Sequence, residues 1–251
     1  MFLVMEGNFA PRELPARGEA GLPEDQIEVW SVDLNVSDND LADFRPTLSK
    51  DETARSERFY FERHRRRFVA ARASLRSVLA AYVDLDPSKI AFEYGHKGKP
   101  CLAGKGANSG LHFNLSHSNE RVLIAVSRVP VGVDIEFIRP LKDCEAIARR
   151  FFSEAEQSAL FSVPPERKLE AFFTCWTRKE AYVKAVGDGL SIPLRSFDVT
   201  FLEDQDPALT VRATAAQGER WFVSHLAGGA NYIGALAVRD HNPQVATWSL
   251  T

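Results

Sequence analysis

Cysteine is scarce in this sequence. Only three of the 251 residues are cysteines, Cys101, Cys144 and Cys175, and no two of them stand at C-x-x-C spacing. This odd, scattered set argues against a disulfide framework and against a structural zinc site, because both need paired or closely spaced cysteines. Few, unpaired cysteines are typical of proteins from a reducing compartment, so we expect a cytoplasmic protein.

Long hydrophobic runs and a charge excess are missing as well. No apolar segment approaches the ~20 residues that cross a bilayer, and the opening segment Met1–Met5 is too short for a signal-peptide core. The net charge of −3 gives no overall argument for nucleic acid or a membrane surface as partner. With 45% hydrophobic residues, the chain is long enough for one large or two small domains.

Common phosphate-binding and nucleic-acid motifs are also absent. The sequence has neither a G-x-x-x-x-G-K-[ST] loop nor a kinase signature, which weakens the alternative of another magnesium-dependent nucleotide-binding enzyme. A second alternative is a non-catalytic nucleic-acid-binding module that uses the basic stretch Arg63–Arg76. No recognised nucleic-acid motif accompanies that stretch, and the overall charge opposes it.

What the sequence does contain is an apolar-periodic run from Leu169 to Val186, which predicts a helix. Large apolar side chains recur in it at three- and four-residue steps. Glu180 and Lys184 lie one turn apart on a flank of the apolar face. Taken alone, they are most simply interpreted as a helix-stabilising surface pair.

A short strand predicted at 131–136 carries two acids. Its apolar and acidic residues alternate, so Asp134 and Glu136 share one face. Two carboxylates at this spacing can form an oxygen-ligand site that suits magnesium better than zinc, although a solvated strand edge is the simpler interpretation. Just upstream, residues 113–118 place short polar groups in a strand and its turn.

Together these three segments resemble a known family. The string F-N-L-S-H-S (113–118), then G-V-D-I-E (132–136), then W-T-R-K-E-A-Y-V-K (176–184) followed by G-D-G-L (187–190) is similar to the ordered motif set of the 4'-phosphopantetheinyl transferases, in their longer, two-half Sfp-type branch. Three motifs in the right order are far more specific than any one of them. The resemblance covers about residues 27 to 240.

The resemblance implies a reaction in which the 4'-phosphopantetheine arm of coenzyme A (CoA) moves to a serine of an apo acyl or peptidyl carrier protein and adenosine 3',5'-bisphosphate is released. In this scheme Asp134, Glu136 and Glu180 hold Mg²⁺. Glu180 is also the expected base, directly or through a metal-bound water. Lys184 is expected to contact the phosphates and to assist the departing group. The two-half length implies a monomer, and the composition predicts a cytoplasmic protein without nucleic-acid or membrane partners.

Four further residues match nucleotide contacts of the family. They are Lys99, in Gly98-Lys99-Pro100, then Arg67 near the 3'-phosphate, and Ser116 with His117. An isolated histidine is more often structural, but its place in the matched string favours binding. The carrier itself is left open by the sequence: a fatty-acid, polyketide, nonribosomal-peptide or aminoadipate-reductase type.

The order of predicted elements also indicates an internal duplication. Capping-box patterns at 49–52 and 153–156, and the helices containing Phe68 and Phe172, are each 104 residues apart. We therefore expect an α+β fold of two pseudo-equivalent halves that meet at a central cleft. The segments are an irregular N-terminal arm (1–25), an N-terminal half with the nucleotide contacts (26–129) and a C-terminal half with the metal site and catalytic helix (130–251). We align 33–35 with 134–136, so only the second half has a complete site.

Overall fold

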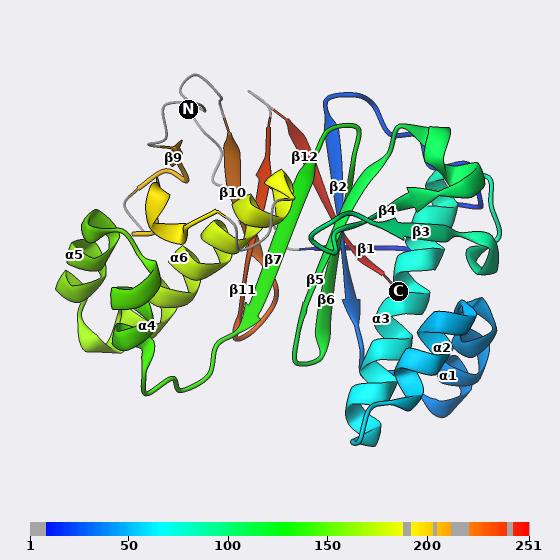
Figure 1. Cartoon of the computed structure of the whole chain (residues 1–251), viewed down its shortest axis with the longest axis horizontal. Coiled ribbons are helices and arrows are strands. Elements are labelled where there is room, and N and C mark those ends of the chain that lie inside the picture. Colours follow the sequence, from blue (N-terminus) through cyan, green and yellow to red (C-terminus); the bar gives the residue numbers. More distant parts are fainter. Residues whose placement is uncertain (1–8, 188–191, 203–204, 212–220, 240–242, 251) are drawn as a thin grey trace. The chain divides into compact units, whose positions relative to one another are not determined.

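The computed structural model of the chain describes residues 9–187, 192–202, 205–211, 221–239 and 243–250. They form two compact units (Figure 1). The N-terminal unit contains residues 9–128 and 244–250, and the C-terminal unit contains the described residues between Val129 and Pro243. None of the described helices combines the length and the apolarity that a membrane crossing requires.

A five-stranded sheet organises the N-terminal unit. Its order is β1 (Ala10–Arg12), β12 (Gln244–Leu250), β2 (Gln26–Asp33), β6 (Arg121–Ser127) and β5 (His112–Ser118). The long helix α3 (Glu62–Tyr82) packs on this sheet, and α1 (Asp38–Phe44) and α2 (Lys50–Glu57) pack on α3. The hairpin of β3 (Ala91–Tyr94) and β4 (Pro100–Ala103) completes the unit, with 3₁₀ turns at Arg45–Thr47, Pro87–Lys89 and Gly104–Ser109.

A three-stranded antiparallel sheet organises the C-terminal unit. Its order is β10 (Phe222–Ala227), β11 (Tyr232–Val238) and β7 (Val131–Phe137). The helix α6 (Pro165–Val186) packs along β7 and β11 (Figure 1). The helices α4 (Cys144–Phe151) and α5 (Glu154–Ser162) pack on α6, and a small sheet pairs β8 (Phe197–Val199) with β9 (Leu209–Val211) after a 3₁₀ turn at Leu194–Ser196.

The two units repeat one pattern, which confirms the predicted α+β duplication. In the N-terminal unit β2 pairs antiparallel with β6, which pairs with β5, and in the C-terminal unit β7 pairs antiparallel with β11, which pairs with β10. Both predicted capping boxes are present, at Ser49 and at Ser153. A short helix, a long helix and a small hairpin follow in the same order in each unit.

The predicted alignment of 33–35 with 134–136 is wrong by three residues. Asp33 ends β2 opposite Arg121, the first residue of β6, whereas Phe137 ends β7 opposite Tyr232, the first residue of β11. The 104-residue offset of the helices therefore extends through the strands. It matches Asp134 with Trp30, which is buried, so the first half has no equivalent of the acidic pair.

The structure also differs from the predicted segments at both ends of the chain. Residues 10–12 of the expected irregular arm form β1, and the last strand, β12, pairs parallel with β1 and with β2. The final strand thus belongs to the N-terminal unit, although we assigned all of 130–251 to the second half. Residues 1–8 of the arm lie outside the described residues.

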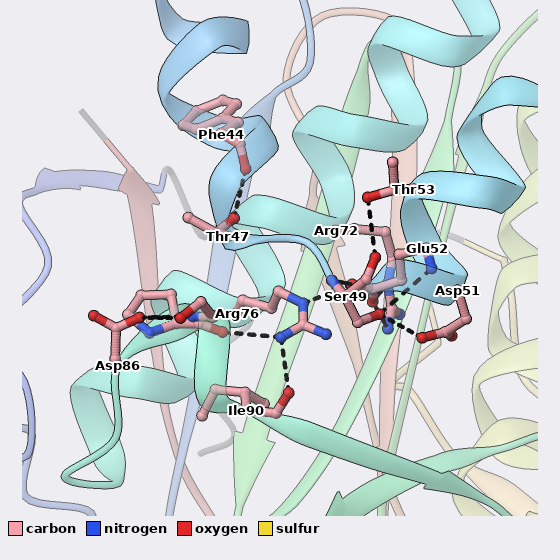
Figure 2. Close-up of polar contacts among 12 residues, drawn as sticks. Phe44, Thr47, Ser49, Asp51, Glu52, Thr53, Arg72, Arg76, Asp86 and Ile90 are labelled. Atoms are coloured by element: carbon pink, nitrogen blue, oxygen red, sulfur yellow. Dashed lines mark hydrogen bonds and ion pairs between the residues drawn. The ribbon is translucent and has the colours of Figure 1, made fainter.

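A buried glutamate joins three elements in each unit. In the N-terminal unit Glu52 accepts hydrogen bonds from the Ser49 amide (2.9 Å), from Arg72 Nε (2.6 Å) and from Arg76 Nε (2.7 Å). Arg76 also donates to the carbonyl oxygens of Pro87 and Ile90, just before β3 (Figure 2). Burial alone would raise the pKa of Glu52, but the two arginines and the capped amide hold this pKa below its ordinary value.

The C-terminal unit repeats this arrangement with lysine in place of arginine. Glu156 caps the start of α5 and forms an ion pair with the buried Lys179 of α6 (2.7 Å). Lys179 also donates to the carbonyl oxygens of Leu194 and Phe197, next to β8. These polar contacts fix the long helix of each unit against its small hairpin, and α6 is the helix that carries Glu180.

Candidate active site

The helix α6 presents the predicted Glu180 and Lys184. It starts with Pro165, whose fixed φ suits the first helical position. It ends at Gly187, which adopts the left-handed conformation (φ 88°) that favours glycine. Glu180 and Lys184 lie one turn apart, as predicted. The end of the third sequence motif, residues 188–190, lies outside the described residues.

Gly132 brings β7 unusually close to α6. A methyl group at this position would fall on the carbonyl oxygen of Ala181 and the amide nitrogen of Ala185, and within 2.9 Å of the Ala185 Cα. Because these are backbone atoms of a helix, no side chain can move aside to make room. The glycine therefore allows a strand-to-helix approach that no larger residue permits.

The close approach places Asp134 of β7 against Lys184 of α6. Lys184 Nζ lies 2.6 Å from Asp134 Oδ1, and Asp134 is 5% exposed. Glu136, two residues further along β7, makes a longer ion pair of 3.7 Å with Arg139. The structure thus brings together the acid pair of the strand and the acid–base pair of the helix, which are 50 residues apart in the chain.

The environment of Glu180 favours its protonated form. Burial raises the pKa of Glu180, and the nearby Asp134 carboxylate raises it further, whereas the Lys184 ammonium opposes the shift and Glu136 adds a smaller increase. A carboxylate with a raised pKa is a stronger base than an ordinary glutamate. Glu180 is therefore suited to accept a proton from a hydroxyl group.

The three acids form an oxygen-only donor set of the kind that Mg²⁺ prefers. Besides burial, which is the main cause of the raised pKa of Glu180, Asp134 and Glu136 repel the Glu180 carboxylate, and a divalent cation would relieve this repulsion. Within the described residues, however, no three acidic, histidine or cysteine side chains are gathered closely enough to form a ready metal site. Lys184 takes the position on Asp134 instead. The donor chemistry fits magnesium, and the ligand assignment stays a prediction.

Lys99 lies at the end of the β3–β4 turn in the N-terminal unit. Gly98 precedes it in a left-handed conformation (φ 81°), and the Gly95 amide donates to the Lys99 carbonyl (3.0 Å). Burial lowers the pKa of Lys99 to about 8. The pKa of His112 is lowered by burial and by the Lys99 charge, so this histidine lies near Lys99. Sequence reasoning missed His112, although it directly precedes the F-N-L-S-H-S string.

Ser116 and His117 are consecutive residues of β5, so their side chains point to opposite faces of the sheet. Ser116 is buried and His117 is exposed. His117 shares its face with Phe113, which packs in the core together with α3 residues. The two side chains therefore approach a bound nucleotide from different sides of the strand, if both contact it as predicted.

Arg67 of α3 is held by an acid that we did not predict. Its Nη2 atom lies 2.7 Å from Glu120 Oε1, in the turn between β5 and β6. A phosphate bound by Arg67 would have to compete with this carboxylate or displace it. Glu120 follows the matched string by two residues, but nothing in its type or spacing identifies it as a partner of Arg67.

Two arginines of the basic stretch Arg63–Arg76 are not available to bind nucleic acid. Arg72 and Arg76 are buried and form ion pairs with Glu52, so they cannot contact a nucleic-acid backbone. Earlier in the same stretch, Arg65, Arg66 and Arg67 form ion pairs with Glu62, Asp38 and Glu120. The stretch Arg63–Arg76 is therefore not a continuous basic surface.

Comparisons with known proteins agree with the sequence motifs. A family model described as "4'-phosphopantetheinyl transferase, N-terminal" matches residues 32–129, and one described as "4'-phosphopantetheinyl transferase superfamily" matches residues 130–237. The 4'-phosphopantetheinyl transferase HetI of Nostoc sp. is 40% identical over 236 residues, which cover 94% of this chain and 97% of HetI. The 4'-phosphopantetheinyl transferase Sfp of Bacillus subtilis is 34% identical over 173 residues, covering 69% of this chain and 75% of Sfp. A solved holo-(acyl-carrier-protein) synthase from Bacillus anthracis, in complex with CoA (3',5'-ADP), is 24% identical with a TM-score of 0.37 and covers 44% of this chain and 94% of its own.

Proposed function

Because this chain belongs to the 4'-phosphopantetheinyl transferase superfamily, we propose that it transfers the 4'-phosphopantetheine group of CoA to a serine of an apo acyl or peptidyl carrier protein. The other product is adenosine 3',5'-bisphosphate. The observation that carries the proposal beyond family membership is the cluster of Glu180, Asp134 and Lys184, in which a half-buried acid with a raised pKa lies beside a partly buried ion pair.

Glu180 acts as the general base. The serine hydroxyl of the carrier is a weak nucleophile until its proton is removed. Glu180 takes this proton, and the serine oxygen then attacks the phosphorus that bears the pantetheine arm. The new oxygen–phosphorus bond forms as the bond to the bridging oxygen of the pyrophosphate breaks. The raised pKa of Glu180 makes the proton transfer more favourable than it would be for an ordinary carboxylate.

Lys184 supplies positive charge one helical turn from Glu180. In the structure its ammonium group lies on Asp134. A substrate pyrophosphate is a stronger attraction for this ammonium than one carboxylate, because it carries more negative charge on more acceptor oxygens. Lys184 therefore stabilises the charge that develops on the departing adenosine bisphosphate.

Asp134, Glu136 and Glu180 would hold Mg²⁺, and the ion would neutralise the pyrophosphate charge when bound. Nucleotide contacts are assigned to Arg67, Lys99, Ser116 and His117 of the N-terminal unit. Of these, Lys99 has a pKa that burial lowers to about 8. The protein is further proposed to be a cytoplasmic monomer.

The test is direct. The protein is incubated with CoA, magnesium chloride and a panel of apo acyl and peptidyl carrier proteins, and each carrier is weighed by intact-mass spectrometry. Transfer adds one phosphopantetheine group to a single serine. A carrier in which that serine is replaced by alanine is the matched control and should gain no mass. If no carrier in a broad panel gains this mass, the proposed function is wrong.

A further inference from the structure

The turn between α2 and α3 exposes two aromatic rings to solvent. Tyr60 is 92% exposed and Phe61 is 50% exposed, and only one other large hydrophobic side chain of the described residues is exposed, Tyr94. The neighbouring Phe59 turns inward and packs on Phe68, with ring centroids 5.4 Å apart. The turn therefore has a buried aromatic anchor and presents the next two rings outward. Adjacent exposed rings on a folded protein usually mark a binding surface.

Phe61 also occupies a helix-capping position at which other residue types would stabilise the helix more. It is the N-cap of α3, and its side chain makes no capping hydrogen bond. Ser, Thr, Asp and Asn are strongly preferred there because their oxygen atoms accept a hydrogen bond from the first helical amides. This chain uses such caps at Ser37, Ser49 and Ser153. A phenylalanine at the cap of the longest helix of the unit gives up this hydrogen bond and departs from the local rule, which is a feature of functional positions.

The exposed rings are held in place by each other and by cationic groups. Phe61 meets Tyr60 edge-on with centroids 4.9 Å apart, and it meets His64 at 5.9 Å. The guanidinium of Arg63 lies 4.9 Å from the Phe61 ring. Such contacts limit the conformations of the rings before any partner arrives, so less entropy is lost on binding.

Two arginines of this turn have charge available for a partner. Among the described residues, no acid forms an ion pair with Arg58 or Arg63, and both are exposed. The following Arg65, Arg66 and Arg67 are each neutralised by an acid. The chain as a whole has a net charge of −3, so this local positive charge stands out against it. Tyr, Phe and Arg are the residue types enriched at protein–protein interfaces.

We propose that Arg58, Tyr60, Phe61 and Arg63, here called the aromatic–arginine turn, form a docking surface for an acidic, partly apolar face of the carrier protein. This rests on the proposed function, which requires a protein substrate to be held while its serine reacts. The rings supply apolar contact area, and the arginines select a partner of negative charge. A surface of this kind acts on the affinity for the carrier and leaves the chemistry of transfer and the affinity for CoA unchanged.

Phe61→Ser is the most informative variant, because docking and stability should change in opposite directions. Serine restores a helix cap, so resistance to urea should increase. The KM for an apo acyl carrier protein or apo peptidyl carrier domain that the wild type modifies should rise about tenfold, as is typical when a central interface side chain is lost. The kcat at saturating carrier and the KM for CoA should stay within twofold of the wild-type values.

A charge-reversal variant provides a second test of the docking surface. Arg63→Glu should raise the KM for the carrier several-fold at low salt and less at high salt, because screening weakens the interaction. Lys105→Glu, in the exposed 3₁₀ turn Gly104–Ser109 of the same unit, is the matched control and should leave this KM unchanged. An unchanged carrier KM in both Phe61→Ser and Arg63→Glu overturns the proposal, as does a rise in the KM for CoA or a change in sedimentation that reveals self-association. Absence of transfer by the wild type would instead refute the proposed function.

Discussion

Replacing Gly132 with alanine tests the closest contact in the candidate site. The added methyl group would lie within 2.9 Å of the Ala185 Cα and would also overlap the Ala181 carbonyl and the Ala185 amide. Carbon atoms in contact normally lie about 3.5–4.0 Å apart. The contact with the Ala185 Cα alone requires β7 and α6 to separate by about 1 Å, and the nearer Ala181 oxygen and Ala185 nitrogen require at least as much. That movement displaces Asp134 from Lys184 and Glu180.

Both stability and activity should respond. Overpacking of this kind costs about 1–3 kcal/mol of unfolding free energy. A displacement of about 1 Å between groups that act together can lower turnover about 10²-fold. Urea denaturation followed by tryptophan fluorescence gives the first quantity, and single-turnover transfer from CoA to an apo carrier gives the second.

Gly228→Ala is the matched control for this variant. A methyl at Gly228 would crowd the Tyr232 Cβ at 2.7 Å and the end of the Ile135 side chain at 2.9 Å, in the same unit. It should lower stability while turnover stays within a few-fold of the wild-type value, because it does not separate β7 from α6 at Asp134. If Gly132→Ala had wild-type stability and turnover, the close approach would not position the site.

Three further predictions concern charged groups. Because the pKa of Lys99 is lowered to about 8, its ammonium loses its proton as the pH rises from 7 to 9. The KM for CoA should therefore rise over this range in the wild type and much less in Lys99→Arg. An identical pH profile in the two proteins would show that Lys99 does not contact CoA. The pKa of His225 is lowered by burial and by Arg178, so the folded protein favours the neutral histidine. The protein should therefore lose stability as the pH falls below about 6.5, the pKa of histidine in the unfolded chain. In urea denaturation, His225→Gln should lose less stability than the wild type between pH 7 and pH 5. Dephospho-CoA should bind more weakly than CoA in isothermal titration calorimetry, and this difference should shrink in Arg67→Ala; an undiminished difference would show that Arg67 does not contact the 3'-phosphate.

Local patterns in the sequence predicted which elements carry the acids, but only the family resemblance joined those elements into one site. The two-residue period of 131–136 placed Asp134 and Glu136 on one strand, and the four-residue step placed Glu180 beside Lys184. The alternation of a strand also implies that Ser116 and His117 point to opposite faces. Comparison of the whole F-N-L-S-H-S string with the family motif does not show this difference. The alignment of 33–35 with 134–136 was likewise based on similar residue types and is wrong. The constant 104-residue offset between the two units gives the correct alignment.

Contacts between distant segments could not be predicted in this way. The pairing of β12 with β2 joins residues more than 200 positions apart, and no local pattern at residues 244–250 specifies a partner strand. The ion pair of Arg67 with Glu120 and the contact of Gly132 with α6 depend on the same long-range packing. The sequence therefore predicted candidate residues, whereas the contacts between them depend on long-range packing.

The role of Glu180 as the base is tested by the single-turnover rate of Glu180→Gln at saturating CoA and carrier, measured over a range of magnesium concentrations. Glutamine keeps the size and polarity of the side chain but cannot accept the serine proton. The rate should fall by about 10²–10⁴-fold, as is typical for loss of a general base, and added magnesium should not restore it. CoA binding, measured by calorimetry, should be nearly unchanged. A Glu180→Gln protein that transfers within a few-fold of the wild-type rate would contradict the assignment of Glu180 as the base.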